Sequence, residues 1–354
     1  MTSRRTFLKT AAGTALLAPS APAAKPLPED DPANVKFAHR IDAASVTDDE
    51  LLFLQQIGLR YARVEFGDRP TPYEKIRATQ ERFARFGMRI YSGVHYAYRR
   101  TRVQLGQPGR DQDIEEYGAF LRDLGRLGIP ISSYDFHPAN TYTTRMVRRR
   151  GYLTREFDLA EFRAKVEKQR FEREYSAEDI WSAYTYFMKA VLPVAEKAGV
   201  KLALHPDDPP LAKMNGVAKL FTHYDGYHRA EQIAGSSRYW GLTFCVGTWS
   251  EGGSQMGKNV FEMIRDFGGR GKRFEIHFRN VTSPLPRFVE TFPDDGYMDM
   301  YQVMKSLRQV RFNGVAEPDH VPGLAGDTGL RRAGTAYCLA CMRAYLRRAN
   351  EEVG

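Results

Sequence analysis

The sequence has little cysteine, three residues in 354, which excludes a disulfide-rich scaffold. It also lacks an apolar run long enough to cross a membrane as a helix, so we expect no stable membrane insertion. Hydrophobic residues make up 42% and charged residues 27%, ordinary values that exclude global disorder. A chain of this length can bury a core without covalent help. The basic excess, a net charge of +9, favours nucleic acid or an anionic small molecule as the partner.

The first 24 residues have the pattern of an export signal. Arg4 and Arg5 stand in a Ser-Arg-Arg-x-Phe-Leu-Lys order, a short apolar stretch follows, and residues 21–23 resemble a cleavage site. We therefore predict a twin-arginine signal peptide over 1–24, recognised by the twin-arginine export machinery, and one domain over 25–354. The mature protein would be periplasmic or otherwise exported, with a net charge of +6 once three basic residues are removed.

Beyond residue 34, short apolar runs alternate with helical patterns. The predicted strands cover residues 35–42, 61–67, 88–96, 131–138, 200–206, 241–247, 274–281 and 312–320. The predicted helices cover roughly residues 48–58, 73–86, 111–127, 177–198, 226–234, 256–267, 298–310 and 333–348, and capping signals precede two of them at Thr47 and Ser176. Eight strands, each followed by a helix, predict an α/β fold of the single (β/α)₈ TIM-barrel type. A doubly wound open sheet is the alternative, but no Gly-x-Gly-x-x-Gly follows the first strand.

A basic insertion at about 139–176 interrupts this alternation between the fourth strand and the fourth helix. In a barrel, such a connection lies at the catalytic face. It is either a solvated flap or a lid that brings Arg or Lys to an anionic substrate. Nucleic acid is disfavoured as a partner, because the chain carries an export pattern and the insertion has no nucleic-acid motif.

Metal-capable side chains stand at the ends of the last four predicted strands: His205, Cys245, His277 and Asp319. The carboxyl ends of parallel barrel strands converge on one mouth, so we expect these four groups to lie together. A mixed nitrogen, sulfur and oxygen set suits a divalent transition metal better than Mg²⁺ or Ca²⁺. The donor types alone do not choose among Mn²⁺, Fe²⁺ and Zn²⁺. His137, late in the fourth strand, is expected to line the same mouth.

Several segments resemble the mannonate dehydratases. They are Leu-His-Pro-Asp-Asp-Pro-Pro at 204–210, Gly-Leu-Thr-Phe-Cys-x-Gly at 241–247, Ile-His-Phe-Arg-Asn-Val at 276–281 and Pro-Asp-His at 318–320. The resemblance extends from about 35 to 345 and is strongest over 200–320. It implies a xylose-isomerase-like barrel with a Mn²⁺ or Fe²⁺ ion. It also implies dehydration of D-mannonate, the sugar-acid substrate, to 2-keto-3-deoxy-gluconate in hexuronate breakdown.

The resemblance also implies roles for individual residues. The metal ligands would be His205, Cys245, His277 and Asp319. His320 would be an acid/base residue beside the metal, and we place Asp319 and Arg279 with it in the catalytic group. Asn280, His137, Arg145 and Asp207 are assigned to substrate binding. Arginine suits a carboxylate substrate because it can bind both oxygens.

One family feature is missing. The family follows Pro-Asp-His-Gly with a Gly-Tyr-Gly loop that supplies a catalytic tyrosine, whereas here His320 is followed by Val321 and the expected tyrosine falls near Ala333. Two alternatives therefore stay open. One is an exported metal-dependent lyase or isomerase/epimerase acting on another sugar acid or keto-sugar. The other is a sugar-acid binding protein without catalysis. The sequence also leaves the oligomeric state open, a homo-oligomer included.

Overall fold

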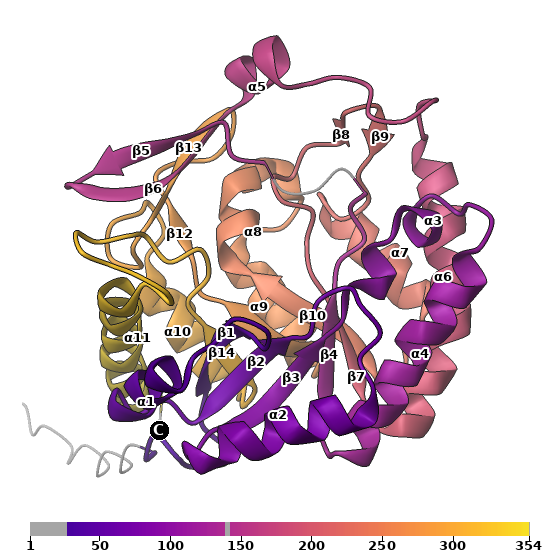
Figure 1. Ribbon diagram of the computed structural model, residues 1–354. Coiled ribbons are helices and arrows are strands. Elements are labelled where there is room, and N and C mark those ends of the chain that lie inside the picture. Colours follow the sequence, from indigo (N-terminus) through magenta and orange to yellow (C-terminus); the bar gives the residue numbers. More distant parts are fainter. Residues whose placement is uncertain (1–26, 139–141, 354) are drawn as a thin grey trace, which may run out of the picture.

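The computed structural model describes residues 27–138 and 142–353, and eight parallel strands form a closed barrel at its centre (Figure 1). Around the barrel the order is β1 (Lys36–Asp42), β14 (Val315–Glu317), β11 (Arg273–His277), β10 (Trp240–Cys245), β7 (Lys201–Leu204), β4 (Ile131–Tyr134), β3 (Arg89–Val94) and β2 (Tyr61–Glu65). Each strand leads to a helix before the next barrel strand begins. The predicted single (β/α)₈ fold is confirmed.

The helices surround the barrel in chain order. The long ones are α1 (Asp48–Gln56), α2 (Tyr73–Arg85), α4 (Arg110–Arg126), α6 (Ala177–Ala198), α7 (Tyr224–Ile233), α9 (Val260–Gly269), α10 (Met300–Gln309) and α11 (Arg332–Val353). Both predicted caps are confirmed: Thr47 with Glu50, and Ser176 with Asp179, form reciprocal capping boxes. Among the described residues, none of these helices combines the length and apolar character needed to span a bilayer.

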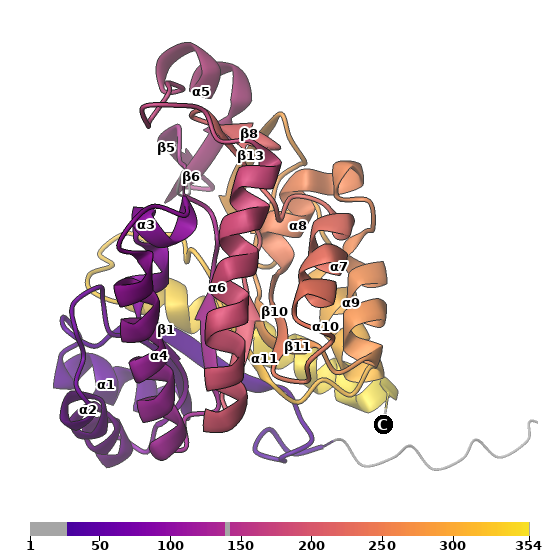
Figure 2. The ribbon, with the colours of Figure 1, turned by 90° about the vertical axis from the view of Figure 1, so that its right-hand side faces the viewer.

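Neighbouring helices pack closely in the layer outside the barrel. Helices α4 and α6 lie side by side (Figure 2), and a Cβ at Gly125 would stand 2.3 Å from the carbonyl oxygen of Ala198. Only glycine permits that approach. Deeper in the core, the indole N–H of Trp240 donates to the hydroxyls of Tyr134 and Tyr184 at 3.1 and 3.2 Å, so this polar atom is not left unpaired on burial.

The inside of the barrel is more polar than the branched aliphatic layers usual for this fold. Arg63 on β2 donates to Ser133 Oγ and to Glu65, both at 2.9 Å. On the opposite side of the barrel, Thr243 donates to Glu275 Oε2 at 2.9 Å. Polar and charged side chains therefore line the inside of the barrel below the mouth, where the predicted site lies.

A second sheet covers part of the mouth, at the upper left of Figure 1. It is antiparallel, in the order β12 (Asn280–Val281), β13 (Arg287–Thr291), β6 (Tyr152–Asp158) and β5 (Arg145–Arg149). The predicted basic insertion thus contains a hairpin and a short helix, α5 (Leu159–Lys165), rather than a long loop. The other half of the sheet comes from a connection that the sequence pattern did not reveal, because a continuous strand was expected over 274–281 and β11 ends at His277.

Arginines of the hairpin are neutralised by nearby carboxylates. Arg149 binds Asp295 through Nε at 2.9 Å, and Tyr152 donates to the same carboxylate at 2.6 Å. Arg145 pairs with Glu156 on the neighbouring strand. Ion pairs and the ring contact between Phe157 and Phe288, with centroids 5.6 Å apart, tie the sheet together.

Candidate active site

Four donor groups converge at the carboxyl ends of neighbouring strands. His205 directly follows β7, Cys245 ends β10, His277 ends β11 and Asp319 lies just beyond β14. His205 Nε2 is 3.1 Å from His277 Nδ1, and Asp319 Oδ2 is 3.7 Å from His277 Nδ1 and 3.9 Å from Cys245 Sγ. Donors bound to one transition-metal ion stand about 3 to 4 Å apart. His205, Cys245 and His277 each offer a donor atom within 4.8 Å of the others, and Asp319 approaches two of them, so this mixed donor set suits a single divalent ion.

Contacts behind the two imidazoles select the nitrogen that each one presents. His205 Nδ1 lies 2.7 Å from the Pro206 carbonyl oxygen, and His277 Nε2 lies 3.0 Å from Glu317 Oε1. These contacts leave His205 Nε2 and His277 Nδ1 facing the shared centre. Metal-binding histidines are commonly oriented in this way, by a hydrogen bond from the nitrogen that does not bind the metal.

The surroundings of Cys245 favour its thiolate form. It is fully buried, and burial opposes its ionisation. The Arg279 guanidinium, 3.6 Å from the sulfur, and hydrogen bonds from His205 and His277 outweigh burial and bring the pKa of Cys245 well below its usual value. Because the thiolate is the form that binds metals, the protein prepares this ligand before an ion arrives.

His277 carries the compensating positive charge. Burial alone would lower its pKa, but Asp319, Cys245 and Glu317 raise it to about 10. The pKa of Asp319 moves the opposite way. Burial opposes ionisation there too, yet His320, His277 and the neighbouring arginines bring the pKa of Asp319 well below its usual value. These shifts favour anionic Cys245 and Asp319 with one extra proton on His277. Such a charge balance suits a site that binds a cation.

Arg279 lies behind the donors rather than at the substrate. Its side chain is fully buried, and four carboxylates surround it: Asp208 at 2.7 Å, Glu251 at 2.9 Å, Glu290 at 2.6 Å and Asp319 at 3.3 Å. Arg279 was predicted to belong to the catalytic group; its side chain lies among these carboxylates and does not line the pocket described below, and its catalytic role stays a prediction. Its carboxylate partners come from separate segments and left no local signal.

A polar pocket opens beside the donors at the mouth. It is lined by Arg40, Arg63, Tyr98, Arg99, Ser133, Tyr134, Asp135, His137, His205, Asp208, Thr243, His277, Asp319 and His320. His137, His320 and three of the predicted ligands thus reach the pocket, and their functional roles stay predictions. Cys245 reaches the donor cluster from behind.

Three arginines of the pocket were missed at the sequence level. Arg99 binds Asp135, and Arg63 pairs with Glu65 at 2.9 Å. Arg40 is held less tightly: its side chain is 47% exposed, and its Nε is 3.7 Å from Glu65. Arg40 is therefore the pocket guanidinium best able to bind a substrate carboxylate. Its position near the carboxyl end of the first strand, β1, was the available signal.

Three residues assigned to substrate binding do not line the pocket. Asn280 donates to the carbonyl oxygens of Pro293 and Met298, which anchors the connection after β11. Asp207 accepts from Lys219 and from the backbone of the 220–221 turn. Arg145 pairs with Glu156 on the mouth sheet. In each case the side chain satisfies a nearby loop or strand, a partner that sequence spacing did not reveal.

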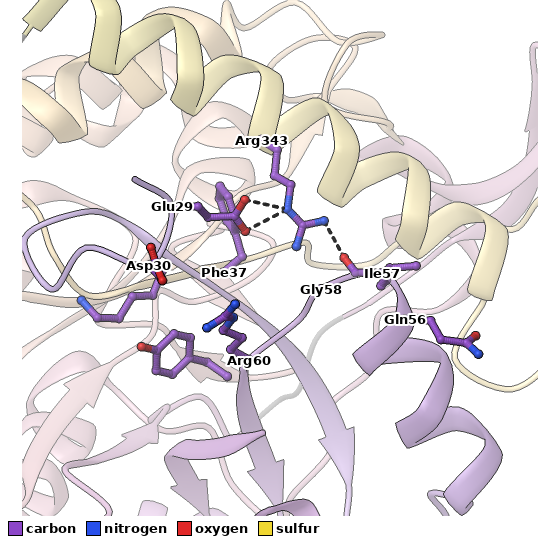
Figure 3. Close-up of a pocket in the computed structure, with 10 residues that line it drawn as sticks. Glu29, Asp30, Phe37, Gln56, Ile57, Gly58, Arg60 and Arg343 are labelled. Carbon is purple, nitrogen blue, oxygen red and sulfur yellow. Dashed lines mark hydrogen bonds and ion pairs between the residues drawn. The ribbon is translucent and has the colours of Figure 1, made fainter. Parts of the chain in front are cut away.

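A separate cavity of about 480 Å³ lies at the starting ends of β1 and β2, opposite the mouth. Figure 3 shows Arg343 of α11 beside Glu29, to which it donates at 2.9 Å, and beside the Ile57 carbonyl oxygen at 2.7 Å. None of the four donors borders this cavity. It lies at the base of the barrel and is distinct from the candidate active site.

Comparisons with known proteins point to one family. The family model for D-mannonate dehydratase (UxuA) matches residues 150–348. Mannonate dehydratase 2 of Halalkalibacterium halodurans is 30% identical over 285 residues, which cover 73% of this chain and 81% of that protein. Mannonate dehydratase of Streptococcus suis strain 05ZYH33 is 32% identical over 254 residues, 64% of this chain and 68% of that protein.

Solved structures agree in shape. The crystal structure of mannonate dehydratase from Streptococcus suis serotype 2 matches with a TM-score of 0.78 at 27% identity, over 89% of this chain and 96% of that chain. A xylose isomerase domain protein from Planctomyces limnophilus matches with a TM-score of 0.60 at 11% identity, over 89% of this chain and 98% of that chain. The second likeness shows the xylose-isomerase-like barrel fold alone.

Proposed function

The chain belongs to the mannonate dehydratase family, a family of hydro-lyases, and we propose that it dehydrates D-mannonate to 2-keto-3-deoxy-gluconate with a bound Mn²⁺ or Fe²⁺. The observation that carries the proposal is the convergence of His205, Cys245, His277 and Asp319 beside an arginine-lined pocket. A metal site next to guanidinium groups suits a substrate that has both hydroxyls and a carboxylate.

The reaction removes the proton from C2 and expels the hydroxyl from C3. A divalent ion, when bound, would withdraw charge from the substrate oxygens and stabilise the negative charge that develops. Among the protein groups, Arg40 would hold the carboxylate. His320, which lines the pocket with Nε2 3.8 Å from Asp319 Oδ1, would take or deliver a proton.

The test is turnover by metal-loaded protein. Protein reconstituted anaerobically with Mn²⁺ or Fe²⁺ should convert D-mannonate to a 2-keto-3-deoxy acid, detected by a keto-acid assay. His205→Ala should lose both the metal and the activity, because one of four donors is removed. His228→Ala, on the exposed side of α7, should keep both. Absence of product with metal-loaded wild type would contradict the proposal.

One observation favours a second candidate, a metal-dependent lyase or epimerase on another sugar acid. Ala333, where the resemblance expects a tyrosine, is exposed at the start of α11, and the nearby Tyr337 donates to Asp294 instead of lining the pocket. A screen of hexonates and uronates separates the candidates. Turnover of other acids only would support the second, and thermal stabilisation without any turnover would indicate a binding protein.

We also propose that residues 1–24 direct twin-arginine export. The support is the sequence pattern around Arg4 and Arg5, since these residues lie outside the described part of the structure. Residues 1–24 fused to a folded reporter should deliver it to the periplasm of a bacterium. Replacing both arginines with lysine should retain the reporter in the cytoplasm, and export that survives this change would contradict the proposal.

A further inference from the structure

We propose that Glu290 is a positioning residue that fixes the tautomer of His320 and thereby leaves His320 Nε2 unprotonated at the pocket. The inference rests on the proposed function, in which His320 handles a proton. Glu290 lies on β13, is 4% exposed, and has Oε1 2.8 Å from His320 Nδ1. That is hydrogen-bond distance to a carboxylate, which can only accept.

A second group competes for the same imidazole nitrogen. Arg279 Nη1 lies 3.1 Å from His320 Nδ1 and 2.6 Å from Glu290 Oε1. A guanidinium can only donate, so Arg279 and Glu290 impose opposite tautomers on His320. With Glu290 as partner, the proton sits on Nδ1 and Nε2 keeps a lone pair. With Arg279 as partner, Nδ1 must accept and the proton moves to Nε2. The shorter contact to Glu290, together with the commitment of Arg279 to that carboxylate, selects the first arrangement.

The backbone and the mouth sheet support the same reading. His320 has φ of +48°, a left-handed conformation that costs energy for a residue with a Cβ. This conformation accompanies a side chain that is 11% exposed and lines the pocket while its other nitrogen faces Glu290. Strand β13 pairs with β6 from the other insertion. The mouth sheet thus anchors the strand that carries Glu290 to His320.

The test compares matched variants of the metal-loaded protein. Glu290→Met keeps roughly the volume but removes the acceptor, which leaves Arg279 as the partner of His320 Nδ1, so kcat for D-mannonate should fall roughly a hundredfold. KM and metal content should stay within about twofold, because the substrate and metal contacts remain. Glu290→Asp should recover part of kcat. The control is Glu156→Gln, which replaces a buried carboxylate on β6 that contacts Arg145 and Arg287. This variant should leave kcat unchanged.

A second readout does not depend on turnover. Nitrogen NMR of ¹⁵N-histidine-labelled protein loaded with diamagnetic Zn²⁺ should show His320 protonated on Nδ1 in the wild type and on Nε2 in Glu290→Met, with His320→Asn assigning the signal. An Nε2–H tautomer in the wild type, or an unchanged kcat in Glu290→Met, would overturn the proposal. If the wild type does not dehydrate D-mannonate, the proposed function fails, and the NMR comparison still decides the tautomer.

Discussion

At the residue scale, the donor cluster is defined by how its charges balance. His277 and Cys245 are both buried, and their surroundings favour an imidazolium–thiolate pair: the pKa of His277 is raised to about 10 and that of Cys245 lies well below its usual value. In metal-free protein, His277 would therefore carry a proton where an ion would bind. Metal binding must displace that proton, because His277 Nδ1 cannot bind an ion and a proton together.

We expect Mn²⁺ binding at pH 8 to release about one proton, from His277, and not two, because Cys245 is already ionised. Affinity should rise with pH until it passes the His277 pKa of about 10. In the metal-free protein, the raised pKa stabilises the fold fully below the unfolded pKa of about 6.5, and this contribution is lost as pH rises through 10. Calorimetry in buffers of different ionisation enthalpy measures the release, and a count near two would contradict the thiolate assignment.

A second residue-scale expectation concerns Arg279. Arg279→Met would leave Asp208, Glu251 and Glu290 around a buried space without their cation, and should lower the free energy of unfolding by about 3 to 5 kcal/mol. Urea denaturation measures the loss. Arg287→Met removes an arginine whose side chain is 58% exposed and should cost less than about 1 kcal/mol. Equal losses in the two variants would contradict the prediction that the buried ion pairs of Arg279 matter more for stability than the exposed pair of Arg287.

At the scale of elements, helix ends contribute to the stability of the fold independently of the candidate active site. Thr47 caps α1 by accepting from the Glu50 backbone N–H, and Glu50 returns a bond to the Thr47 backbone N–H at 2.9 Å. This pair lies on the connection after β1. It satisfies two backbone N–H donors that have no partner within the helix.

Thr47→Ala should lower the free energy of unfolding by about 1 kcal/mol, with kcat and metal content unchanged. Thr79→Ala, inside α2, is the control, because its hydroxyl only donates back to the Lys75 carbonyl oxygen. It should stay within about 0.5 kcal/mol of the wild type. Chemical denaturation of the three proteins gives the comparison, and a Thr47→Ala value matching that of Thr79→Ala would argue against the cap.

At the scale of the whole molecule, the donor cluster joins the ends of four neighbouring barrel strands, β7, β10, β11 and β14. An ion held there cross-links segments that are far apart in the chain. A ligand that binds only the folded state stabilises it by mass action.

Saturating Mn²⁺ at a hundredfold excess over its Kd should therefore stabilise the fold by about 2.7 kcal/mol. Thermal scans with Mn²⁺ and with chelator should differ by several degrees, and His205→Ala should abolish the difference. A wild-type Tm that does not respond to saturating metal would contradict a site in the folded protein.

Much of the fold follows from local pattern. Strand and helix periodicities predicted the barrel, and the capping residues Thr47 and Ser176 marked real helix starts. The ends of strands also carried information about the site. Because all barrel strands run in parallel, His205 and His277 could be placed at one mouth from chain position alone.

The sequence by itself therefore determined the barrel, the parallel direction of its strands and the donors at the strand ends. These features depend on short-range periodicity and on the fact that all barrel strands run the same way. Only the tertiary structure decided how the groups behind the donors are used. Arg279 turned out to be enclosed by carboxylates, and Glu290 to reach His320 from a sheet built by two insertions. Contacts between segments far apart in the chain depend on how those segments pack, and no local pattern encodes that.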